Sequence, residues 1–156
     1  MNEHVKQPVI LDSVNNAEDC KTFLVGVLTT PGFLDQAMKL IDPKGGFFSD
    51  AMTESNLEEF VRVQQGPIIE AVPDFTILNW RYAIDSGNLA VVKFQATASH
   101  KGKHATWTCV WIFGLEGGKV VSLEKSFDRG GWNAVLGFQP WDQIVQPTFE
   151  SKNRSA

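Results

Sequence analysis

The apolar residues of this 156-residue chain change their spacing at Asp74, and this change constrains the fold more than any other feature. Before Asp74 they recur every three or four positions, which is typical of helices, and after it they alternate with polar residues, which is typical of strands. The alternation predicts strands at about 75–85, 88–100 and 105–115, and a fourth within 117–128. Helices first and hairpins afterwards predict an α+β domain, with the helices on one face of an antiparallel sheet.

Capping residues and prolines predict where the first two helices begin and end. Asn16 can cap a helix whose first turn is acidic. Thr30-Pro31 is expected to start a second helix, with the threonine as N-cap and the proline at the first helical position. This helix should end before Asp42-Pro43. The turn Lys44-Gly45-Gly46 then leads to a short apolar segment, Phe47-Phe48, which can be a strand or a plug.

A third helix is expected to begin at a capping box. Ser55 and Glu58 have the spacing at which each side chain satisfies a backbone N–H at the other residue. Gly66-Pro67 should interrupt or kink this helix, because proline removes a backbone hydrogen bond and disfavours helix at the residue before it. Pro73 should end it. About three helices therefore precede the strands.

Composition limits the size of the fold and the kinds of partner. With 43% hydrophobic residues the chain can bury one substantial core. We expect an irregular lead-in at 1–16, a single domain at 17–149 and a disordered polar tail at 150–156. The net charge of −4 comes without any basic cluster, which argues against nucleic acid as a partner.

The cysteines and the short motifs point to a cytoplasmic protein without a cofactor. Cys20 and Cys109 lie far apart and in no metal-ligand spacing, so we expect two reduced, buried thiols. The sequence shows no secretory signal and no apolar run of membrane-spanning length, so no membrane partner is expected. It also lacks a GxGxxG, a P-loop and a metal-binding pattern, and we expect no cofactor.

The strand expected at 105–115 is apolar on both faces. Trp107 and Trp111 fall on one face, and Val110 and Ile112 fall on the other. Helices can cover only one of these faces, so the other needs a second copy of the chain or the C-terminal segment as cover. A homodimer is the expected assembly. The apolar segment 132–141 should fold back on the sheet or across the dimer, and Trp132 could close a pocket mouth.

The stretch 117–128 ends on a carboxylate, Asp128, after a paired-glycine turn. Alternation divides its residues between an apolar face and a polar face, which hold respectively Val121, Leu123 and Phe127, and Ser122, Glu124, Ser126 and Asp128. The polar face either meets solvent or lines a cavity. Alternation alone favours solvent, because half-buried antiparallel strands normally have this pattern.

Four segments together resemble the SnoaL-like polyketide cyclases, within the ketosteroid-isomerase-like (nuclear transport factor 2-like) superfamily. They are Ala71-Val72-Pro73-Asp74-Phe75, Ser99-His100-Lys101-Gly102, Gly118-Lys119-Val120-Val121 followed by Asp128, and Leu136-Gly137 with Pro140. The resemblance covers roughly 17–141. It implies a cone-shaped, curved antiparallel sheet whose helices enclose an apolar pocket. One departure is Glu124, which stands where many relatives carry an aromatic residue.

The resemblance also implies a catalytic pair inside that pocket. Asp128 would be the general base, because an apolar pocket disfavours the ionised carboxylate and raises its pKa. His100 would be the general acid or electrophile. Glu124 is a secondary candidate as a second inner carboxylate. The residues expected to contact substrate are Trp107, Trp111, Trp80, Asn79 and Trp132.

Each of these residues also has a purely structural interpretation. Asp128 precedes Arg129-Gly130-Gly131 and could be a turn residue or an ion-pair partner. His100 could be an exposed histidine at the start of a hairpin turn. Glu124 could form a salt bridge with a neighbouring strand. The tryptophans could belong to the core, and Asn79 could lie outside the pocket.

The function that the resemblance implies is a cofactor-independent cyclase or isomerase of secondary-metabolite biosynthesis. Its substrate would be a hydrophobic polyketide or meroterpenoid carbonyl compound, processed by Asp/His acid–base chemistry. A dehydratase of this fold would need two pocket histidines with assisting tyrosines, whereas Tyr82 is the only tyrosine. An epoxide hydrolase would need an Asp-Arg-Asp arrangement, and no Arg-x-Asp accompanies His100. A non-catalytic ligand-binding or dimerisation module is a further alternative.

Overall fold

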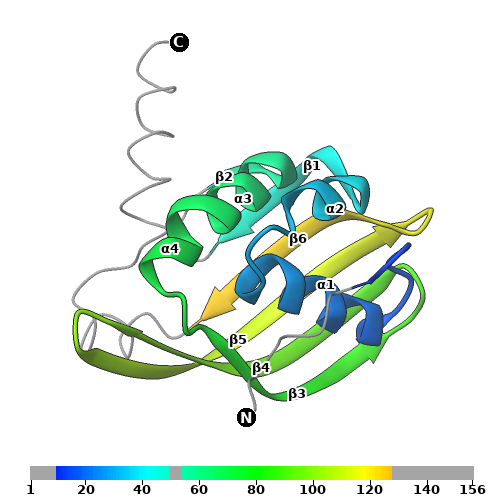
Figure 1. Ribbon diagram of the computed structural model, residues 1–156. Coiled ribbons are helices and arrows are strands. Elements are labelled where there is room, and N and C mark those ends of the chain that lie inside the picture. Colours follow the sequence, from blue (N-terminus) through cyan, green and yellow to red (C-terminus); the bar gives the residue numbers. More distant parts are fainter. Residues whose placement is uncertain (1–9, 50–53, 128–156) are drawn as a thin grey trace.

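The computed structural model describes residues 10–49 and 54–127, which form a twisted six-stranded sheet with helices on one face (Figure 1). The strand order is β2-β1-β6-β5-β4-β3, and every neighbouring pair is antiparallel except β1 and β6. The strands are β1 (Ile41–Ser49), β2 (Glu54–Asn56), β3 (Thr76–Asp85), β4 (Leu89–His100), β5 (Lys103–Glu116) and β6 (Lys119–Phe127). The helices are α1 (Ala17–Thr29), α2 (Leu34–Lys39), α3 (Leu57–Val63), the π-helix η1 (Gln64–Ile68) and α4 (Ile69–Ala71). The predicted α+β class is confirmed.

The four predicted strands form a continuous meander, β3 to β6. Two of its turns have the geometry that their sequences predict. Lys101 and Gly102 have φ values of 52° and 81°, and Gly117 and Gly118 have φ values of 60° and 78°. Two consecutive positive φ values define the type I′ turn, whose twist matches that of the strands it joins. Glycine adopts positive φ at little cost, and it occupies three of these four positions, with Lys101 as the exception.

The first helix begins where its cap predicts, but the second begins later. Asn16 caps α1, because its side chain accepts a hydrogen bond from the Asp19 N–H at 2.9 Å. Thr30 does not start α2. It ends α1 instead, donating its N–H to the Gly26 carbonyl at 3.2 Å. The helix α2 follows Phe33, which makes no side-chain capping bond.

A single glutamine side chain explains this later start. Gln65 reaches from η1 to the end of α1, where its Nε2 contacts the carbonyl oxygens of Gly26, Val27 and Thr30 at 3.1, 2.8 and 3.0 Å. Its Oε1 accepts the N–H of Phe33 at 2.8 Å. Gln65 therefore satisfies backbone groups on both sides of the turn between α1 and α2, and the Thr30 side chain is not needed as a cap.

The third helix is capped one residue later than predicted. Ser55 pairs with Phe47 in the β1–β2 ladder, and Asn56 caps α3 by accepting the N–H of Glu59 at 2.8 Å. Pro67 interrupts the regular helix, as predicted, because it lies within the π-helical turn η1. The chain nevertheless continues as helix to Ala71.

The segment predicted as a turn at 44–46 lies inside strand β1. This strand runs parallel to β6, with a register shift between Ile41 and Gly46. A Cβ on Gly45 would lie 2.3 Å from the backbone oxygen of Val121, so only glycine allows the two strands to approach here. Phe47 and Phe48 pair with Leu123 and Glu124 of β6, so this segment is a strand and not a plug.

The core lies between the helices and one face of the sheet. Alternate residues of β4 and β5 point into it, and the side chains between them are half-buried or exposed on the opposite face. We call the first the covered face and the second the open face. Among the described residues, no helix is long and apolar enough to cross a bilayer. The largest fully buried side chains include Phe23, Phe47, Phe60, Phe94 and Phe113.

Candidate functional site

Aromatic rings line the covered face at the centre of the sheet. Phe47 of β1 stacks on Phe60 of α3, with ring centroids 4.5 Å apart. Phe60 meets Trp111 of β5 edge-on at 5.9 Å, and Trp111 lies 6.1 Å from Phe94 of β4. Trp107, two residues from Cys109 on β5, meets Phe75 edge-on at 5.8 Å. Trp107 and Trp111 are both buried, so both expected substrate-binding tryptophans of β5 lie on the covered face.

Lys125 places a cation against this aromatic surface. It lies in β6 between Trp111 of β5 and Ser49 of β1, and it shares the covered face with Leu123. Its Nζ lies over the Trp111 ring, 5.6 Å from the centroid, and over the Phe47 ring at 6.0 Å. Both distances fall within cation–π range. The sequence interpretation overlooked Lys125, although alternation from Leu123 gives its face.

The indole nitrogen of Trp111 is a buried donor without a partner. The Nε1 atoms of Trp111 and Trp80 are both inaccessible to solvent and make no hydrogen bond. Trp80 stacks on Phe94, with ring centroids 5.5 Å apart and an angle of 19° between the ring planes. Buried donors are nearly always paired in proteins, so each unpaired N–H is available to an acceptor that enters the interior.

His100 is half-buried at the end of β4, on the covered face. Its Nδ1 lies 2.9 Å from the carbonyl oxygen of Ala71, at the end of α4. A carbonyl can only accept, so Nδ1 carries the hydrogen. In the neutral ring the lone pair is then on Nε2, which can accept a proton and later return it. His100 is therefore tied to the helical layer, and is not the freely exposed turn histidine of the structural interpretation.

The strand register separates His100 from the end of β6. His100 pairs with Lys103 of β5, whereas Phe127, the last described residue of β6, pairs with Cys109. Six residues of strand span about 20 Å. Asp128 and Trp132 lie outside the described residues, so their expected roles stay predictions.

Glu124 lies on the open face and not among the aromatic rings. Its side chain is exposed, as is that of Ser126 two residues on, whereas Leu123 and Lys125 take the covered side. Glu124 pairs with Ile112 of β5, whereas His100 pairs with Lys103 of the same strand. These two β5 residues are nine positions apart, which is about 30 Å along the strand. The structure therefore does not bring Glu124 together with His100. The polar side of β6 faces outward here because helix α3 packs against its other side.

Asn79 also lies on the open face, at an irregularity in the sheet. The β3–β4 register shifts between Leu78 and Arg81, so Asn79 and Trp80 together oppose Phe94 alone. Asn79 has φ of 55°, and its Nδ2 donates to Gln95 Oε1 at 2.5 Å. This β-bulge directs Asn79 outward, as the structural interpretation of that residue predicted.

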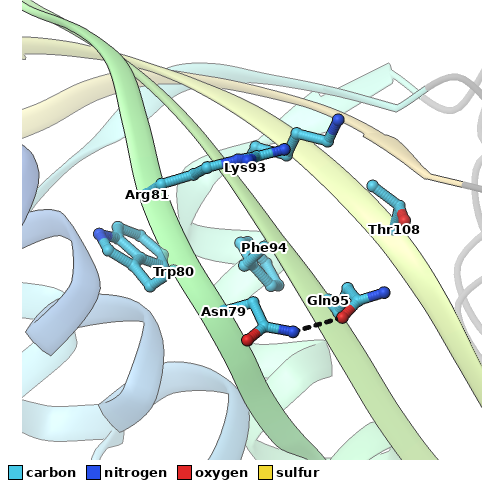
Figure 2. Close-up of a pocket in the computed structure, with 7 residues that line it drawn as sticks. All are labelled: Asn79, Trp80, Arg81, Lys93, Phe94, Gln95 and Thr108. Atoms are coloured by element: carbon cyan, nitrogen blue, oxygen red, sulfur yellow. Dashed lines mark hydrogen bonds between the residues drawn. The ribbon is translucent and has the colours of Figure 1, made fainter.

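The bulge opens a groove of about 510 Å³ on the same surface (Figure 2). Figure 2 shows Arg81 extending toward Lys93, with the Asn79–Gln95 hydrogen bond beside them. The groove is lined mainly by polar side chains. The lining residues are Asn79, Trp80, Arg81, Lys93, Phe94, Gln95 and Thr108.

Asp74 anchors the loop before β3. Its Oδ1 accepts the backbone N–H of Ser99 at 2.9 Å. Burial alone would raise the pKa of Asp74, but hydrogen bonds from the backbone and side chain of Ser99 outweigh it and hold the pKa below its usual range. His104 is exposed and lies between the hydroxyls of Thr97 and Ser99, at 2.7 and 2.9 Å. Within the described part of the chain, no cluster of three or more His, Cys, Asp or Glu side chains could hold a metal ion.

Solved structures share this architecture. IdmH of Streptomyces antibioticus, a putative polyketide cyclase, matches with a TM-score of 0.64 and 16% identity over 78% of this chain and 99% of that one. A putative SnoaL-like polyketide cyclase from Jannaschia sp. CCS1 matches with a TM-score of 0.65 and 15% identity, over 78% of this chain and 90% of that one. An NTF2-like protein of unknown function from Burkholderia pseudomallei matches at 0.57 and 18%, over 67% and 86%.

These matches establish the NTF2-like fold that the sequence resemblance implied. No protein-family model and no curated protein matches the sequence. Identities of 15–18% are too low to carry an activity from one chain to another, because this fold supports many functions.

Proposed function

We propose that the protein is a cofactor-independent cyclase or isomerase that binds a hydrophobic carbonyl compound against the covered face of its sheet. The observation that carries the proposal is the position of Lys125, whose ammonium lies 5.6 Å from the centre of the Trp111 ring within an aromatic interior. Aromatic walls suit a polycyclic substrate. A cation held among them can stabilise negative charge more strongly than it could in water.

The proposed reaction begins with removal of a proton from the carbon next to the carbonyl. Asp128 takes this proton, and the electrons of the C–H bond move to the carbonyl oxygen. The ammonium of Lys125 stabilises the resulting enolate. Return of the proton to another carbon completes an isomerisation. Attack of the enolate carbon on a second carbonyl of the same molecule, with protonation of the new alkoxide, completes an aldol cyclisation.

His100 takes a separate part in this proposal. On β5, His100 pairs with Lys103 and Phe127 pairs with Cys109. Six residues of β5 therefore separate His100 from the end of β6. His100 and the end of β6 therefore act at different points of an extended substrate. His100 takes up a proton from solvent at Nε2 and passes this proton to a second oxygen of the substrate. This division replaces a directly hydrogen-bonded Asp–His pair.

The proposed substrates are polyketide or meroterpenoid ketones of secondary metabolism. The support is the fold shared with the two putative polyketide cyclases, together with the aromatic interior. Cys20 and Cys109 are both buried, which is compatible with reduced thiols and with the proposed cytoplasmic location.

Deuterium exchange tests the proposal without knowledge of the natural substrate. The enzyme in D₂O should catalyse exchange of the α-protons of 1-tetralone, followed by NMR. Asp128→Asn keeps the shape and removes the base, so the rate should fall about 10²- to 10⁴-fold. Asp35→Asn, an exposed residue of α2, is the matched control and should exchange at the wild-type rate.

Two results would count against the proposal. Unchanged exchange by Asp128→Asn would remove Asp128 as the base. If wild type accelerates neither 1-tetralone nor a panel of larger aromatic ketones, while binding them, the protein is a ligand-binding module of the same fold and not an enzyme.

A further inference from the structure

Gln64, at the start of η1, carries a buried amide without a hydrogen-bond partner. The residue is only 5% exposed, and none of the residues that the structure describes pairs with its side chain. Buried amides are nearly always paired, because an unpaired one gives up its hydrogen bonds to water without replacement. Methionine has about the same length and would avoid this cost. A polar group that is kept at the expense of stability is typical of a binding site.

The adjacent residue, Gln65, uses its own amide in a different way. It contacts three carbonyl oxygens and one N–H at the turn between α1 and α2. Consecutive helical residues point about 100° apart, so Gln64 points away from that turn. Gln64 continues the buried stripe of α3, which is formed by Leu57, Phe60 and Val61 at helical spacing. Its amide therefore faces the sheet.

Gln64 lies between the aromatic cluster and His100 on the covered face. Phe60, four residues earlier, meets the Trp111 ring edge-on. Ala71, seven residues later, has its carbonyl oxygen 2.9 Å from His100 Nδ1. Four and seven helical residues span about 6 and 10 Å, so Gln64 is within reach of a ligand that extends from one group to the other. The helices α3 and α4 follow one another along this side of the sheet (Figure 1).

We infer that Gln64 binds a third oxygen of the substrate, besides those assigned to Lys125 and His100, and that this oxygen belongs to a hydroxyl group. The inference rests on the proposed function for the face on which the substrate binds. A primary amide has two N–H donors and an oxygen that accepts. A second ketone oxygen would leave the amide oxygen unpaired, whereas a hydroxyl group can donate to it. The substrate is therefore a hydroxylated ketone, and Gln64 selects it over the parent ketone.

An ordered water molecule is the alternative partner for the amide. Water would satisfy Gln64 in the absence of any ligand, so the amide would then be part of the structure. The two explanations differ in what happens when the amide is removed. A substrate-binding amide determines which ligand is preferred, whereas a hydrated structural amide determines only the stability of the fold.

Isothermal titration calorimetry with the 4-, 5-, 6- and 7-hydroxy derivatives of 1-tetralone tests the inference without any turnover. Wild type should bind at least one derivative about fivefold or more tightly than 1-tetralone. Gln64→Met removes the amide and should bind that derivative and 1-tetralone within about twofold of each other. Its melting temperature should rise by about 2–6 °C, because an unpaired buried amide has been removed.

Gln65→Met is the matched control, because it removes the neighbouring amide, whose partners are backbone groups. This variant should show the opposite behaviour to Gln64→Met. Its melting temperature should fall, since carbonyl oxygens at the end of α1 lose their donor. Its preference for the hydroxylated derivative should stay as in wild type.

Three results would overturn the inference. Gln64→Met could keep the preference, wild type could bind all four derivatives no more tightly than 1-tetralone, or the melting temperature of Gln64→Met could fall. Each of these results leaves the α-proton exchange of 1-tetralone by wild type intact. A failure of the proposed reaction is distinguishable, because exchange would then be absent while the preference for the hydroxylated derivative remained.

Discussion

Replacing Lys125 by methionine should separate the stability of the protein from its activity. The ammonium lies 5.6 and 6.0 Å from the Trp111 and Phe47 ring centres, near the outer limit of cation–π contacts. Each contact should therefore contribute no more than about 0.5–1 kcal/mol. Methionine keeps the length of the side chain and packs well on aromatic rings. Loss of the two cation–π contacts should therefore lower the free energy of unfolding by no more than about 2 kcal/mol.

The rate should change much more. If Lys125 stabilises the enolate, its removal resembles the loss of one oxyanion-hole donor, which costs about 10²- to 10³-fold, or about 2.7–4 kcal/mol. Urea unfolding followed by tryptophan fluorescence measures the stability, and α-proton exchange of 1-tetralone measures the rate. Lys125→Arg should retain most of the activity because it keeps the charge. Lys119→Met, an exposed lysine of the same strand, should affect neither quantity.

An exchange rate of Lys125→Met within about threefold of wild type would show that Lys125 does not stabilise the enolate. A rate that falls only in proportion to a loss of folded protein would show that Lys125 is a structural residue.

Four further predictions follow from single contacts. Gln65→Glu places a carboxylate against the carbonyls of Gly26 and its neighbours, and urea unfolding should show a loss of about 2–3 kcal/mol, more than for Gln65→Met. Burial raises the pKa of the Cys20 thiol to about 12, so iodoacetamide at pH 8 should label it only as fast as the protein unfolds; immediate labelling would contradict this. The lowered pKa of Asp74 stabilises the fold above its unfolded pKa of about 3.8, and this contribution is lost as pH falls through the folded value. Wild type should therefore exceed Asp74→Asn in stability at pH 7 but not at pH 2. Gly45→Ala should lower the melting temperature and impair 1-tetralone exchange, because a Cβ there meets a backbone oxygen of β6 at 2.3 Å.

The meander was predictable because each of its strands is paired with its sequence neighbour. Alternation and paired turn residues are local signals, and they located β3 to β6 to within a few residues. Strand β1 was not predictable in this way. Its partner β6 lies some 75 residues later, and the pairing is parallel with a shift after Ile41. The predicted caps Thr30 and Ser55 were wrong for a similar reason. Contacts of Gln65 decide where α2 begins, and the pairing of Ser55 with Phe47 decides where α3 begins.

The candidate site shows the same limit. Alternation correctly divided β6 into two faces, but it could not tell which face the helices would cover. Phe60 of α3 stacks on Phe47 of β1, and this nonlocal contact turns the Leu123 side of β6 inward and takes Lys125 with it. The position of His100 depends equally on a distant partner, the carbonyl of Ala71, 29 residues earlier.

The register of β6 decides which charge meets the interior, because the neighbouring residues Glu124 and Lys125 carry opposite charges to opposite faces. A slip of one residue would turn Lys125 outward and Glu124 inward. It would place a carboxylate against the negatively charged faces of Trp111 and Phe47, where a cation is attracted and an anion is repelled. Two glycines oppose such a slip: a Cβ on Gly45 would meet the Val121 carbonyl at 2.3 Å, and a Cβ on Gly114 would meet the Ser122 hydroxyl oxygen at 2.2 Å. Both glycines lie beside register shifts of the strands that flank β6. These two close contacts therefore help to fix which charge of β6 meets the interior.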